Sequence, residues 1–283
     1  MRKSVTEGSP QLARSGNQKT NSKRNSIIIG LEGVLESISR KEKSMNRNLV
    51  TTITIGIFAL IAVLWAAQPG RGADVKTYPE MAPLDQYLMA DRDAEIALAR
   101  TAAPPSISSN ATVMVLGSHG YETAVKGKNG FVCVVERAWM GAFDSPEFWN
   151  AKDRSPSCFN PQAARSVLPI TFKRTDLVLA GLSKAQIMEG IKKAFQNNEL
   201  PTLEPGAMTY MMSKQGRLND RAGHWVPHLM FYVPVADAMT WGADMAGSPV
   251  LLNPHFNGAP EPVTEFMVPV SEWSDGTPAS TDR

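Results

Sequence analysis

The sequence is poor in the residues and motifs that most often identify an enzyme. Its 283 residues include only two cysteines and four histidines. It holds no Cys-x-x-Cys pair, no glycine-rich phosphate loop, no dinucleotide-binding glycine pattern and no Gly-x-Ser-x-Gly nucleophile turn. These absences argue against the redox, nucleotide-binding and serine-hydrolase classes that such motifs mark. We therefore expect no cofactor.

Basic residues are in the minority over most of the chain. Residues 74–283 hold 18 Lys and Arg against 23 Asp and Glu, whereas residues 1–73 hold 11 against 4. A protein that binds nucleic acid needs a basic face to displace the counterions of the phosphate backbone. The acidic balance of residues 74–283 therefore predicts that nucleic acid is not a partner.

The basic N-terminal part has the organisation of an export signal. Residues 1–44 are polar and bury too little apolar surface to offset the entropy of ordering, so we expect a disordered leader. Arg47 then precedes an uncharged stretch, residues 49–67, which is followed by small residues. This is the order of a secretory signal over residues 45–73. Met45 reads as the true initiator, and the alternative is that residues 1–44 form a cytoplasmic tail.

The uncharged stretch leaves two interpretations open. Its 19 residues exceed the usual signal core of about 7–15 residues and approach the roughly 20 needed to span a bilayer. It is either a cleaved signal peptide or an uncleaved N-terminal anchor. Both place residues 74–283 outside the cytoplasm as a single domain, periplasmic or secreted. Residues 49–67 would contact the membrane only if they are not removed.

The cysteine count agrees with export. Cys133 and Cys158 both fall in the predicted domain, and an even number of cysteines in an oxidising compartment favours a disulfide. The alternative is two unpaired thiols packed in the interior.

The hydrophobic pattern predicts an α+β fold with a mainly antiparallel sheet and two or three packed helices. Asp91 is placed to cap a helix over residues 90–103, and Ser183 with Gln186 forms a capping box before residues 184–196. A shorter helix begins at Pro161 after Asn160. Apolar, β-branched runs predict strands, and a helical turn is expected at residues 237–242; the strands cover residues 111–116, 121–126, 131–136, 208–213, 228–233, 250–252 and 263–270.

One turn signal predicts a specific strand pairing. Asn129-Gly130 separates two of the apolar runs, and both residues tolerate a positive φ. Asn-Gly between such runs is a strong hairpin signal. We therefore expect residues 121–126 to pair with residues 131–136.

The residues before one strand offer acid–base chemistry. Asp220, His224 and His228 lie within nine positions, and a histidine near a carboxylate can serve as a general base in a hydrolase or lyase. A metal site is not expected, because Pro227 keeps the chain extended. Four extended residues span about 13 Å, too far for two metal bonds of about 2 Å each. The alternative role for His228 is a structural one at the start of a strand.

Other residues are candidates for binding rather than catalysis. Trp139 and Trp149 lie in an aromatic loop between the cysteines that could form a stacking platform or, alternatively, a small core. His119 follows a strand within Gly117-Ser118-His119-Gly120, which is either a binding loop or a tight turn. The sequence thus supports two functions: a non-catalytic module that binds a small ligand or an envelope component, or an extracytoplasmic hydrolase or lyase.

Overall fold

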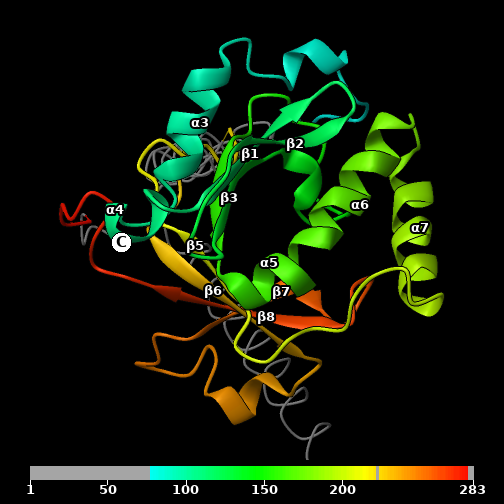
Figure 1. Ribbon diagram of the computed structural model, residues 1–283. Helices are drawn as coiled ribbons and strands as arrows, with labels where there is room; N and C mark the ends of the chain where they lie inside the picture. Colours follow the sequence, from blue (N-terminus) through cyan, green and yellow to red (C-terminus); the bar gives the residue numbers. More distant parts are fainter. Residues whose placement is uncertain (1–76, 221–222, 280–283) are drawn as a thin grey trace, which may run out of the picture. The chain divides into compact units, whose positions relative to one another are not determined.

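An eight-stranded mixed sheet forms the centre of the protein, and helices cover both of its faces (Figure 1). The computed structural model describes residues 77–279, apart from 221 and 222. The strand order is β2-β1-β3-β4-β5-β6-β8-β7, and every neighbouring pair is antiparallel except β1 and β3. The strands are β1 (Thr112–Gly117), β2 (Gly120–Val125), β3 (Val132–Glu136), β4 (Ser155–Phe159), β5 (Met208–Met211), β6 (His228–Pro234), β7 (Leu251–Asn257) and β8 (Val263–Pro269). The predicted α+β class is confirmed.

Five α-helices lie in the described part of the chain, more than the two or three expected. They are α3 (Arg92–Arg100), α4 (Pro105–Ser108), α5 (Pro161–Ser166), α6 (Leu168–Leu179) and α7 (Lys184–Gln196). Three 3₁₀ turns accompany them: η1 (Leu84–Gln86), η2 (Ala138–Met140) and η3 (Ala238–Trp241). The sequence did not reveal α6, because three residues of its buried face are polar, namely Thr171, Arg174 and Thr175. A helix of this kind lacks the apolar stripe that identifies an amphipathic helix.

The predicted helix caps are present. The side chain of Asp91 accepts hydrogen bonds from two backbone amides at the start of α3. Ser183 and Gln186 form the reciprocal capping box of α7, and Asn160 caps α5. Each cap satisfies amides that have no partner inside the helix. These helix starts are therefore fixed by local chemistry.

The predicted Asn-Gly hairpin is wrong. β2 pairs with β1, whereas β3 lies on the other side of β1 and runs parallel to it. The turn that does form is Ser118-His119, which joins Gly117 to Gly120, with Gly120 at a φ of 112°. Asn129 instead uses its side chain to fix the loop before β3, donating to the carbonyl of Ile107 and accepting from the amide of Phe131. The local turn signal was overridden by long-range pairing.

The alternation of side chains along β3 and β4 divides the protein into two layers. Cys133 and Val135 point to the face covered by α3, where they pack with Val113. Val134 points to the opposite face and packs with residues of α5 and β4, including Phe159. In Figure 1 the sheet curves around α5 and α6, and α7 packs against the outer side of α6.

A buried ion pair joins α3 to the end of β3. Glu95 and Arg137 are each 1% exposed, and the Nη2 of Arg137 lies 2.9 Å from Oε1 of Glu95. Arg137 also donates to the carbonyls of Tyr87 and Val135, and Glu95 accepts from the amide of Leu116. Because a charge in the interior must be paired and hydrogen-bonded, these contacts hold the α3 layer in one position.

The membrane segment proposed from the sequence lies outside the described residues. Among residues 77–279 no helix has both the length and the apolar character that crossing a bilayer requires. This finding does not extend to residues 1–44 or 49–67.

Cys133 and Cys158 form a disulfide between directly opposed positions of β3 and β4. Both side chains are fully buried. Replacing both by alanine in C133A/C158A should lower the free energy of unfolding by about 3 kcal/mol, because the bond closes a loop with a sequence separation of 25. Urea denaturation with and without reductant measures the loss. Reductant should lower the stability of the wild type and leave the variant unchanged; two reactive thiols in the denatured, unreduced wild type would contradict the bond.

Candidate functional site

A cavity of about 1110 Å³ is lined by residues of the sheet on one side and of α5 and α6 on the other. This volume is slightly above the usual range of small-molecule sites, roughly 300 to 1000 Å³. Much of the wall is apolar; it includes Met140, Phe159, Ile170, Met211, Met230 and Met267. Thioether and aromatic walls of this kind adapt to an apolar ligand.

Strand alternation determines which side chains reach the cavity. On β6, Met230 and Tyr232 are two residues apart and face the same side of the sheet. Their partners across the pair with β8 are Met267 and Glu265, which also line the cavity. β8 therefore places a carboxyl group next to two methionines of the wall.

The most completely buried carboxyl of the cavity is that of Glu261, immediately before β8. It is 3% exposed and pairs with Arg174 of α6, which is fully buried. The Nε and Nη2 atoms of Arg174 donate to the same oxygen, Oε1, at 2.8 and 2.6 Å. Within the described part of the chain, the other oxygen, Oε2, is buried and has no hydrogen-bond partner. A buried acceptor without a partner costs free energy unless a ligand or water satisfies it.

Arg174 has few donors left for a ligand. Its Nη1 donates to the carbonyls of Trp139 and Gly141, at 3.1 and 2.9 Å. Its guanidinium also lies 4.3 Å from the centre of the Phe143 ring. The guanidinium of Arg174 thus links α6 to η2 and to the segment before β8. It stabilises the wall of the cavity and has little capacity to bind a ligand.

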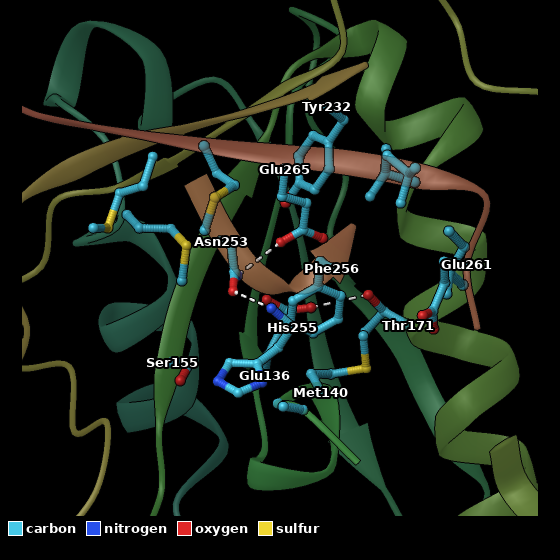
Figure 2. A pocket seen from close by; sticks show the side chains of 18 of the residues that line it. Glu136, Met140, Ser155, Thr171, Tyr232, Asn253, His255, Phe256, Glu261 and Glu265 are labelled. Atoms are coloured by element: carbon cyan, nitrogen blue, oxygen red, sulfur yellow. Dashed lines mark hydrogen bonds between the residues drawn. The ribbon is translucent and has the colours of Figure 1, made fainter. Parts of the chain in front are cut away.

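Glu136 supplies a second carboxyl from the end of β3. It is 8% exposed and accepts hydrogen bonds from Ser157 of β4, at 2.7 Å, and from Thr171 of α6, at 2.9 Å. Burial raises the pKa of Glu136, although both hydrogen bonds and the charge of Arg174 act in the opposite direction. Figure 2 shows the contact between Glu136 and Thr171 inside the cavity.

Glu265 is the third carboxyl, and Figure 2 shows it turned toward the same space as Glu136. It accepts a hydrogen bond from the side-chain amide of Asn253 on β7, at 3.2 Å. Burial raises the pKa of Glu265 to about 8, and the nearby carboxyls of Glu261 and Glu136 add to the effect while Arg174 reduces it. The group is therefore mostly protonated at pH 7. A carboxyl in this state can donate a hydrogen bond, and it ionises readily if a cation arrives.

A fourth carboxyl of the cavity wall, that of Asp153, is buried in a way that disfavours its charged form. Asp153 is 5% exposed, and its Oδ1 is buried with no hydrogen-bond partner among the described residues. Burial raises the pKa of Asp153 to about 8, with a further contribution from the charge of Glu147. Arg217 lowers the pKa but does not offset the burial. Both Asp153 and Glu147 line the cavity.

The cavity brings together two of the three predicted catalytic residues. His224 and His228 both line it, His224 exposed and His228 4% exposed. The Nδ1 of His228 lies 2.7 Å from the carbonyl of Val226, and because a carbonyl only accepts, this nitrogen carries the proton. Burial lowers the pKa of His228, although that hydrogen bond acts in the opposite direction. The ring is therefore neutral at pH 7, with Nε2 as an acceptor.

Asp220 is held by other partners. Its carboxylate pairs with Arg217 at 2.6 Å and accepts the hydroxyl of Tyr78. Its backbone amide donates to Glu147. The orienting partner of His228 is thus the Val226 carbonyl rather than this carboxylate.

The predicted binding residues lie elsewhere. Trp139 is fully buried and Trp149 is 5% exposed; both pack in a cluster with Tyr87 and Phe148. The indole of Trp139 donates to Thr175 of α6. The two rings therefore form the small core that was the alternative interpretation, and they present no exposed stacking surface. His119 lies in the exposed turn between β1 and β2.

Sequence reasoning missed three carboxyl residues of the cavity, Glu136, Glu261 and Glu265, and the arginine behind its wall, Arg174. Two of them carried a usable signal. Glu136 ends an apolar run. Glu265 lies two residues from both Val263 and Met267, so the period of two in a strand places its carboxyl on the same inward face as these apolar side chains. No group of three or more His, Cys, Asp or Glu in the described ranges has an arrangement that could hold a metal ion.

Comparison with known proteins identified no relative of this chain. No protein-family model, curated protein or solved structure matches the chain. The chemistry of the cavity therefore carries the functional argument.

Replacing Arg174 by methionine should destabilise the protein by about 3–5 kcal/mol, because it leaves Glu261 buried without its counterion. The matched control is Arg165→Met on α5, whose side chain is 59% exposed and pairs with Glu204; its stability should stay within experimental error of the wild type. Urea denaturation compares the two. The double variant R174M/E261M should recover part of the loss. Equal stability of R174M and R165M would contradict the role assigned to the ion pair.

Proposed function

We propose that residues 74–283 form an exported, non-catalytic domain that binds a small organic molecule in the cavity between the sheet and α5–α6. The observation that carries this proposal is the cavity itself, with about 1110 Å³ of space and mostly apolar walls. Folded interiors are close-packed, and voids larger than a water molecule are few. A space of this size therefore needs an explanation, and a ligand provides one.

The polar groups of the cavity support the same proposal. Ligand sites combine an apolar wall with a few polar groups that orient the ligand. Here Glu265, Asn253 and Tyr232 come from three adjacent strands and gather in one part of the wall (Figure 2). Burial, together with the charge of Glu265, holds the pKa of Tyr232 well above its ordinary range, so its hydroxyl remains a donor.

A second candidate function is a hydrolase or lyase in the same cavity. The observation that favours it is that a candidate base, His228, and a candidate acid, Glu265, both line the cavity. The lowered pKa of His228 leaves a neutral base, and the raised pKa of Glu265 leaves a protonated acid. Such separation of pKa values is typical of acid–base pairs. Mass spectrometry of a ligand recovered after incubation separates the two functions: an unchanged ligand supports binding alone, and a product supports catalysis.

The export part of the proposal rests on the sequence. Residues 45–73 have the organisation of a signal peptide or an anchor, and residues 1–44 that of a leader. The disulfide is compatible with an oxidising compartment.

Narrowing the cavity should weaken binding of an uncharged apolar probe. Met230→Trp adds bulk on the cavity side of β6, and we expect the dissociation constant for Nile red to rise about tenfold, which is a loss of about 1.4 kcal/mol. Leu229→Trp is the matched control, because Leu229 points to the other side of the same strand. Fluorescence titration measures both. If the wild type does not bind Nile red, or if the two variants lose affinity equally, the cavity is not the binding site.

Export predicts where the protein is found and in which form. Fractionation of the native host should recover the domain outside the cytoplasm, with Cys133 and Cys158 oxidised. Intact mass would show whether residues 45–73 have been removed. Recovery of reduced, full-length chain in the cytosol would contradict export without affecting the ligand-binding proposal.

A further inference from the structure

The wall of the cavity carries a strong excess of carboxyl groups. Six line it: Glu136, Asp144, Glu147, Asp153, Glu261 and Glu265. Among the described residues the lining contains one arginine or lysine, Arg137, and its charge is already paired with Glu95. Arg174, behind the wall, neutralises Glu261 alone. Asp144 is exposed and lies 3.3 Å from His255, whereas Glu136 and Glu265 are desolvated and form no ion pair with a basic side chain in the described part of the chain. Because burying a charge without a counterion opposes folding, a positively charged occupant would stabilise these two groups.

Two carboxyl oxygens of this wall point to the same conclusion independently of the charge count. Oε2 of Glu261 and Oδ1 of Asp153 are both buried, and neither has a hydrogen-bond partner among residues 77–279. The residues themselves are 3% and 5% exposed. An ionised carboxyl oxygen without a partner can be satisfied only by a donor, and a cationic nitrogen is the strongest donor for it. At Asp153, whose pKa burial raises to about 8, a nearby cation would also favour ionisation.

The other walls fit an organic cation rather than a bare metal ion. Trp225, Tyr232 and Phe256 contribute aromatic rings to the lining, and aromatic faces attract ammonium groups. The methionines described above provide an apolar surface for a hydrocarbon body. No cluster in the described part of the chain has the geometry of a metal site.

From this geometry we infer that the cavity selects a protonated organic amine, with its ammonium group against Glu265 or Asp153 and its apolar body along the methionine-lined wall. This inference rests on the proposed ligand-binding function and names its ligand class. Anionic amphiphiles are excluded by the same carboxyl groups.

Ligand displacement tests the inference with three probes that differ only in the head group. Octylamine, 1-octanol and octanoate compete with Nile red for the full-length protein. Octylamine should displace the dye at a concentration about tenfold lower than 1-octanol, and octanoate should be the weakest. If Nile red binds but 1-octanol competes as well as octylamine, the inference is overturned and the ligand-binding function stands. If Nile red does not bind, the ligand-binding function itself fails.

Substitution of the carboxyls locates the ammonium group. Glu265→Gln keeps the shape of the protonated acid and should reduce the preference for octylamine over 1-octanol about tenfold. Asp153→Asn is a second variant that tests the other candidate carboxyl. Glu122→Gln is the matched control, because Glu122 is on β2 and its exposed side chain pairs with Arg92. Unchanged octylamine preference in both E265Q and D153N would overturn the inference.

The pH dependence provides a readout that a structural role would not produce. The groups that face Glu265 are Glu261 ahead of β8, Glu136 on β3, Arg174 on α6, Tyr232 on β6, and Asn253 and His255 on β7. With the pKa of Glu265 raised to about 8, its carboxyl is neutral below that pH and charged above it. Affinity for octylamine should therefore rise from pH 7 to pH 9, where an alkylamine with a pKa near 10.4 stays largely protonated.

Calorimetry completes the test. Binding at pH 7 should release a proton from Glu265 or Asp153, which appears as a dependence of the measured heat on the ionisation enthalpy of the buffer. E265Q should release less. A binding heat that is independent of the buffer would overturn the assignment of the ammonium group to these carboxyls.

Discussion

The buried ion pair between Arg174 and Glu261 is the contact on which the arrangement of the cavity depends. It joins α6, in the middle of the chain, to the segment that leads into β8 near its end. The Nε and Nη2 atoms of Arg174 both donate to the same carboxylate oxygen of Glu261. The Nη1 atom donates to two backbone carbonyls in and next to η2. The pair therefore closes the wall but leaves the other carboxyls, Glu136 and Glu265, without a counterion of their own. Structural rigidity and an acidic interior thus arise from the same contact.

The two faces of β3 and β4 divide structural and functional roles between neighbouring residues. Cys133 and Cys158 point to the α3 layer and covalently fix the register of the two strands. That register sets Val134 opposite Ser157, and the next inward position on β3 is Glu136. The hydrogen bond from Ser157 to Glu136 depends on this alignment, because a shift of one residue would turn every side chain of the strand to the other face. The covalent link on one side therefore positions an acid on the other.

Local chemistry could be predicted from the sequence, and long-range pairing could not. Helix starts were readable because Asp91, Ser183 and Asn160 act within one turn of the chain. The Asn129-Gly130 hairpin failed because β1 occupies the edge of β3 that the hairpin needs. The histidines of the site were found because histidine is chemically conspicuous, whereas Arg174 was hidden in a helix without an apolar stripe. Its partner Glu261 is 87 residues away, and no local pattern joins them.

The cavity is complete only when β8 occupies its place in the sheet. Among the described strands it comes last in the sequence, yet it lies between β6 and β7 and contributes Glu265, with Glu261 just ahead of it. Until residues 263–269 insert between their neighbours, one wall is missing and the space is open to solvent. Under the proposed ligand binding and export, a partly emerged or partly translocated chain would not retain a small molecule, and the proposed ligand would bind only in the compartment in which folding finishes.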